Sequence, residues 1–198
     1  MGLVEYPGWL DDLRHRRPDE SAGEHCARIV RGLDGASLVH DAEKLAALFL
    51  CNEPEARAKL IASMKTNCAT TMREILCLAG CDHALIICEY VVGMAMAWVL
   101  QAARELDALE PASTWKDLQP GDGMWYGTPG TNNDHVEFCL SVPNRLTGFA
   151  EHAGGGRSQN LISVQPASDI RWSAGRPLRG IVKAGKMCLN PATHDNPY

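Results

Sequence analysis

Cys68 is the residue of this chain best placed to act as a nucleophile. Two polar residues, Thr66 and Asn67, precede it, and the run 69–76 that follows has the composition of a helix. A thiol at a helix N-terminus lies at the positive end of the helix dipole, where free N–H groups stabilise a thiolate and an oxyanion. The alternative is a thiol that packs into the first helical turn, as cysteines of intracellular proteins often do.

A nucleophilic thiol needs a base, and His135 is the best placed of the seven histidines. It follows the polar run 132–134 and opens the apolar run 136–140, so we expect it at the start of a strand that faces a cleft. His83 follows Asp82 at an expected helix start, where it is a cap or a surface residue. The remaining histidines lie in charged or polar segments: His15, His25, His40 and His194.

A third group must orient the imidazole, and two neighbours compete for this role. His152 and Glu151 follow the expected strand 147–150 and precede three glycines. Because adjacent residues of a strand point to opposite faces, only one of the two can meet His135. The pattern predicts Phe149 in the core and Glu151 on the same face of the strand as Phe149. Burying an unpaired carboxylate on that face would cost free energy. We therefore expect Glu151 to leave the core and His152 to orient His135, unless His152 is an exposed loop residue.

The order of these motifs resembles a known enzyme family. After Cys68 come the turn Leu118-Gln119-Pro120-Gly121-Asp122, then Asp134-His135-Val136, then His152-Ala153. This order is similar to that of the NlpC-type and CHAP-type cysteine peptidases and amidases of the papain superfamily, which cut peptidoglycan peptides. In those families a Leu-x-Pro-Gly-Asp turn starts the first central strand, a His-Val strand supplies the base, and a later strand ends in the orienting His or Glu.

The resemblance covers about residues 66–183 and implies a papain-like hydrolase of peptidoglycan stem peptides. It implies Cys68 as the nucleophile, His135 as the base, and His152 or Glu151 as the orienting group, with no metal and no cofactor. The chain departs from the family at the nucleophile, where Asn67-Cys68-Ala69-Thr70 stands in place of the usual Asp-Cys-Ser-Gly.

Two other classes of function remain open. An acyltransferase or transpeptidase would use the same site, with an amine in place of water. A non-catalytic protein would bind the cell wall, or would be stabilised by zinc on a cluster of thiols and imidazole: Cys77, Cys81, His83 and Cys88. The cluster lacks the Cys-x-x-Cys knuckles that zinc sites prefer, so buried packing is the favoured interpretation.

The elements that position these residues change in type along the chain. Helices are expected over 24–33, 41–50, 55–64, 66–76 and 84–106, and Asp41 is the expected cap of the second. Short strands separated by Gly and Pro turns are expected over 123–126, 136–142, 147–150, 161–164 and 178–182.

Helices first and strands later predict an α+β fold, with a helical N-terminal half followed by a small antiparallel sheet. We divide the chain into a helical segment (1–64) packed on the core, a papain-like catalytic core (65–185) and a loosely ordered tail (186–198).

Composition limits the partners and the location. The chain has 198 residues and a formal net charge of −5, which argues against a broad nucleic-acid interface. Its eight cysteines lie mostly among aliphatic residues, as expected for reduced core thiols. The most apolar stretch, 84–100, contains Glu89 and is shorter than the ~20 residues that cross a membrane, so no membrane insertion is expected.

The N-terminus shows no signal peptide, so we expect synthesis in the cytoplasm. A wall-cutting enzyme of this kind would reach the cell wall or periplasm through phage machinery or a bacterial secretion machine. A delivery or neutralising protein is then an expected partner.

Overall fold

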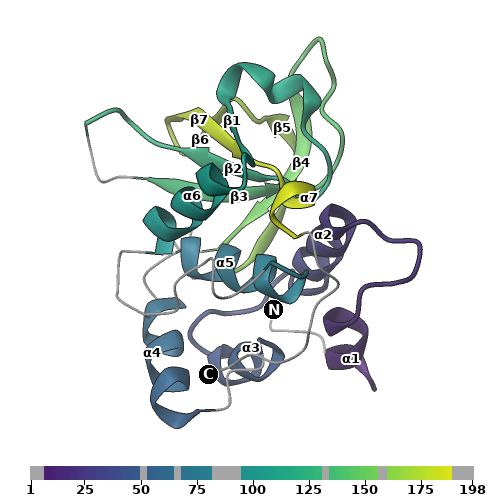
Figure 1. Ribbon diagram of the computed structural model, residues 1–198, viewed down its shortest axis with the longest axis vertical. Coiled ribbons are helices and arrows are strands. Elements are labelled where there is room, and N and C mark those ends of the chain that lie inside the picture. Colours follow the sequence, from purple (N-terminus) through teal and green to yellow (C-terminus); the bar gives the residue numbers. More distant parts are fainter. Residues whose placement is uncertain are drawn as a thin grey trace.

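Figure 1 shows the computed structural model of the protein, in which a group of helices lies against one side of an antiparallel sheet. The structure describes residues 7–49, 53–64, 68–81, 95–130, 134–155 and 160–188. Helices come first along the chain and strands later, so the predicted α+β class is confirmed. The expected cap residues Thr66 and Asn67, the segment 82–94 and the tail beyond residue 188 lie outside the described residues.

The helices agree closely with the apolar spacing of the sequence. They are α1 (Trp9–Arg14), α2 (Ala22–Gly32), α3 (Ala42–Leu48), α4 (Pro54–Met64), α5 (Cys68–Leu78), α6 (Ala95–Glu105) and α7 (Ala184–Met187), with a 3-10 helix η1 (Ala112–Asp117). Ser21 caps α2 through a reciprocal pair of bonds with Glu24. Asp41 precedes α3, but its carboxylate accepts the Ser37 N–H at 2.9 Å and does not cap the helix as expected.

The strands form one antiparallel sheet in the order β1-β7-β2-β3-β4-β5, with β6 paired to β7. They are β1 (Leu109–Pro111), β2 (Gly123–Tyr126), β3 (His135–Cys139), β4 (Phe149–Gly154), β5 (Ser163–Asp169), β6 (Trp172–Ser173) and β7 (Arg176–Val182). The turn before β2 forms as its residues predict. Gly121 adopts a φ of 87°, and the Asp122 carboxylate accepts the Gln119 N–H at 2.9 Å.

Two apolar cores cover the two faces of the sheet. Val136, Phe138 and Ala153 face the helices in one core, while Tyr126 and Cys139 lie in the other. Helix α5 packs against β3. The sequence predicts Phe149 in the core, but its side chain is 48% exposed, while Ala150 and His152 on the opposite face of β4 are buried.

Backbone hydrogen bonds join the segment between α2 and α3 to the segment that precedes β5. Gly35 N–H donates to Ile162 C=O at 2.9 Å, and Leu38 N–H donates to Asn160 C=O at 2.8 Å. Within the described ranges, no helix is long and apolar enough to cross a bilayer.

Candidate active site

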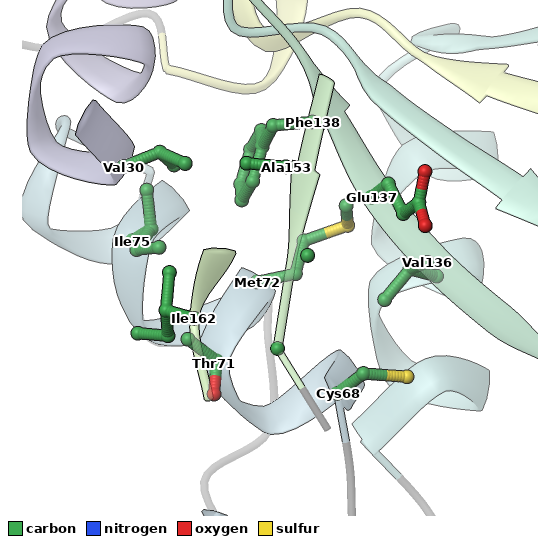
Figure 2. A pocket seen from close by; sticks show the side chains of 12 residues that line it. Val30, Cys68, Thr71, Met72, Ile75, Val136, Glu137, Phe138, Ala153 and Ile162 are labelled. Carbon is green, nitrogen blue, oxygen red and sulfur yellow. The ribbon is translucent and has the colours of Figure 1, made fainter. Parts of the chain in front are cut away.

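Cys68 is the first residue of α5 and is partly exposed. Figure 2 shows it at one end of a pocket between α5 and the strands β3 and β4. Residues 65–67, which precede it, lie outside the described residues. The position offers an accessible thiol at the described start of α5.

His135 is the first residue of β3, and its side chain reaches Cys68. A hydrogen bond joins the thiol to the imidazole, which is 8% exposed and stacks on Tyr126 with ring centroids 6.4 Å apart. Its Nε2 atom lies 2.9 Å from Glu137 Oε1. The structure thus brings together the two residues that the sequence predicted as nucleophile and base.

The imidazole of His135 is held in its protonated form. Burial by itself lowers the pKa of His135, but hydrogen bonds and charge interactions with Cys68 and Glu137 outweigh it and raise the pKa to about 9. At neutral pH the thiol therefore faces an imidazolium, the state that stabilises a thiolate by charge.

Glu137 is the central polar residue of this group, and the sequence analysis did not identify it. Its side chain is fully buried, and it receives hydrogen bonds from three neighbours. His135 Nε2 lies 2.9 Å from Oε1, Ser173 Oγ donates to Oε1 at 2.8 Å, and His152 Nδ1 lies 2.5 Å from Oε2. A buried carboxylate with three donors is satisfied as an anion and can orient a cationic imidazole.

His152 lies behind Glu137 and does not take the place expected for it. It is 5% exposed on β4, opposite Cys139 in register, so its ring shares the face of Glu137. A carboxylate only accepts, so we assign the Nδ1 proton to His152. Its Nε2 then accepts the Ser168 O–H at 2.7 Å. The predicted meeting of His152 with His135 is thereby replaced by a bridge through Glu137.

Glu151, the competing candidate, lies outside this group. It leaves the core as expected: its side chain is 43% exposed, and its carboxylate pairs with Arg31 at 2.6 Å. The physical reason is the strand alternation, which turns Glu151 away from the face that carries its neighbour His152.

One signal in the sequence could have identified Glu137. It stands two residues after His135, and side chains two apart on a strand share a face. A carboxylate inside an otherwise apolar strand needs a partner, and the histidine on the same face is the nearest available.

The structure gives no support to the zinc alternative within the described residues. No group of three or more His, Cys, Asp or Glu side chains there is arranged to hold a metal ion. Cys77 and Cys81 are buried among apolar side chains, while His83 and Cys88 lie outside the described residues.

Comparison of the chain with protein-family models, with curated proteins and with solved structures finds no match.

Proposed function

We propose that this protein is a cysteine hydrolase that cleaves a peptide or amide bond. The observation that carries the proposal is the hydrogen-bonded chain from Cys68 through His135 to the buried Glu137. A thiol, an imidazole and an orienting carboxylate are the three parts that thiol-based acyl transfer needs.

The proposed reaction begins with the Cys68 thiolate, which attacks the carbonyl carbon of the substrate. The backbone N–H of Cys68 stabilises the oxyanion that forms. The His135 imidazolium then gives its proton to the leaving amine, and the thioester forms as the C–N bond breaks. His135, now neutral, takes a proton from water, the hydroxide attacks the thioester, and the thiol is released.

Glu137 is a positioning residue in this scheme. It holds the His135 ring with Nε2 protonated. It also balances the imidazolium charge in a buried environment. His152 and Ser173 in turn hold the two oxygens of Glu137.

The resemblance to NlpC-type and CHAP-type enzymes makes peptidoglycan stem peptides the substrate to test first. Purified peptidoglycan is incubated with the native protein, and the soluble products are identified by mass spectrometry. We expect new peptide fragments with free amine and carboxyl ends, and none from Cys68→Ala. Cys77→Ala, which removes a buried thiol outside the site, is the matched control and should still release fragments.

The same experiment with an added amine, such as glycine amide, separates hydrolysis from transpeptidation. A hydrolase gives free carboxylates in both conditions, whereas a transpeptidase gives products heavier by the bound amine. Absence of any Cys68-dependent product from peptidoglycan and from simple peptide amides would refute the proposed function.

A further inference from the structure

Two buried thiols meet where the last described helix packs on a helix of the N-terminal half. Cys26 lies in the middle of α2, and Cys188 directly follows α7. The two helices are in contact, and Figure 1 shows α7 beside α2. A hydrogen bond joins the thiols of Cys188 and Cys26. The proposed reaction uses neither residue, so this contact needs a separate explanation.

The surroundings of Cys188 hold its sulfur against Cys26. Its Sγ atom donates to the Leu76 carbonyl oxygen at 3.4 Å and accepts a hydrogen bond from the Cys81 N–H. The Cys188 N–H donates to the Ala184 carbonyl oxygen at 3.0 Å, which fixes the backbone as well. The two sulfurs therefore come together in one defined arrangement, with the end of α5 as a third wall.

Burial protects both thiols while the protein is fully folded. Cys26 is 0% exposed and Cys188 is 3% exposed. Contact with Cys26 and burial raise the pKa of the Cys188 thiol, so little thiolate forms there at neutral pH. A reagent therefore reaches the pair only through a local opening of the structure.

Helix α7 is the element that opens most easily. It has four residues, of which Gly185 and Lys186 are exposed, whereas α2 has eleven residues and a capping box. A single short turn of helix separates from the core at a lower cost than a long capped helix. Opening of α7 presents Cys188 to a reagent while Cys26 stays in place on α2.

A bond between the two sulfurs would close a ring that contains most of the chain. The ring would run from α2 to the end of α7 and would include Cys68, His135 and strands β1 to β7. A cross-link that closes a long loop removes more entropy from the unfolded chain than one that closes a short loop. The position of this pair is therefore one where a disulfide would stabilise the fold strongly.

We propose that Cys26 and Cys188 form an oxidation site, at which a disulfide oxidant such as oxidised glutathione converts the two thiols into an intramolecular disulfide that ties α7 to α2. The inference is independent of the proposed function, because neither thiol belongs to the candidate active site. The new bond replaces a contact that the reduced protein already makes.

The oxidation proceeds in two thiol–disulfide exchange steps. When α7 opens, the Cys188 thiolate attacks one sulfur of oxidised glutathione, a mixed disulfide forms, and a glutathione thiolate leaves. When α7 returns, Cys26 gives its proton to solvent and its sulfur attacks the Cys188 sulfur of the mixed disulfide. The Cys26–Cys188 bond forms as the second glutathione thiolate leaves. Two protein thiols are oxidised, and one glutathione disulfide is reduced to two glutathione thiols.

The test oxidises the folded protein and maps its disulfides. Protein reduced with dithiothreitol is desalted and incubated with oxidised glutathione, and the remaining thiols are blocked with iodoacetamide in denaturant. After digestion without reductant, mass spectrometry should find the Cys26 and Cys188 peptides joined and lighter by two hydrogen atoms than their sum. The same protocol is run on Cys68→Ala, because the partly exposed thiol of Cys68 can itself react with glutathione.

We expect this cross-link in most molecules of both proteins, and a thermal unfolding midpoint about 5–15 °C above that of the reduced protein. Dithiothreitol should reverse both effects. Cys26→Ala and Cys188→Ala should each lose the cross-link, and their midpoints should be the same with and without oxidant. Cys139→Ala is the matched control, since it removes an equally buried thiol from the other core, and it should keep the cross-link and the shift.

Recovery of Cys26 and Cys188 as alkylated thiols after oxidation would overturn the inference, and the two residues would then only fill the core. The same conclusion would follow if either residue were joined mainly to a different cysteine, or if glutathione remained on Cys188. An unchanged midpoint in the cross-linked protein would overturn the stabilising tie between α7 and α2. None of these results would affect the proposed function, which depends on Cys68.

Discussion

Replacing Glu137 by glutamine tests the central contact of the proposed site. The substitution keeps the shape of the side chain and removes its charge. The amide oxygen can still accept from His135 and Ser173, while the amide NH₂ then faces His152 Nδ1. His152 can accept from that NH₂ if its proton moves to Nε2, where it donates to Ser168, so the variant is expected to fold.

The expected changes in the pKa of His135 and in turnover follow from the loss of the Glu137 charge. A hydrogen bond to a charged partner contributes about 1.5–3 kcal/mol, so without Glu137 the pKa of His135 falls by about 1–2 units. The native value of about 9 results from Cys68 and Glu137 together, acting against burial. Because a smaller fraction of the imidazolium then remains at neutral pH and the charge that orients the ring is lost, we expect turnover to fall about 10- to 100-fold.

Turnover against pH and the NMR titration of the His135 ring measure this effect directly. Native protein should keep the ring protonated until the pH rises through about 9. Because the folded pKa lies above the unfolded value, the stability contributed by His135 is complete below pH 6.5 and is lost between pH 6.5 and about 9. In Glu137→Gln the ring should lose its proton at a lower pH. The stability lost as the pH rises should be correspondingly smaller.

Glu151→Gln is the matched control, since it makes the same chemical change in an exposed ion pair with Arg31. It should stay within about threefold of native turnover, because exposed ion pairs contribute little. An unchanged His135 titration in a folded Glu137→Gln variant, together with native turnover, would refute the assignment of Glu137.

Further predictions concern the other members of the site. At mildly acidic pH, iodoacetamide should label Cys68 before Cys139, because burial raises the pKa of Cys139 to about 12; peptide mapping that finds Cys139 labelled first would contradict this. His135→Ala should lower turnover about 10²- to 10⁴-fold with an unchanged circular dichroism spectrum, and a folded variant at native rate would remove it from the mechanism. His152→Ala should lower turnover more than Glu151→Gln but less than His135→Ala, because it acts through Glu137; the reverse order in parallel assays would favour Glu151 as the orienting group.

The parts of the site that depend on local sequence could be predicted. The local sequence predicted Cys68 in a helix and His135 at the start of a strand, and the structure has α5 from Cys68 and β3 from His135. The contact of Glu137 with His152 depends on the pairing of β3 with β4, which sets Cys139 opposite His152. That register is a long-range property, and no single segment of the sequence contains it.

Phe149 and Asp41 show where local rules fail. Strand alternation predicted Phe149 in the core, but the face of β4 that carries Ala150 and His152 is the buried one there, and Phe149 is 48% exposed. Asp41 has the residue type of a helix cap, yet its carboxylate accepts the backbone N–H of Ser37 and makes no capping bond to α3. In both cases tertiary surroundings outweigh the local preference.

The contacts between the N-terminal half and the later strands delay completion of the core while the chain is being synthesised. Asp34 accepts a hydrogen bond from Val164 N–H, 130 residues later in the chain. The backbones of Gly23 and Gly121 are so close that a Cβ atom at Gly121 would lie 1.9 Å from the Gly23 carbonyl oxygen. At ~5–20 residues per second, the helices wait roughly 6 to 26 s for the strand that completes their core. During that interval their apolar faces are exposed on the ribosome, where a chaperone that covers such surfaces would raise the yield of folded protein.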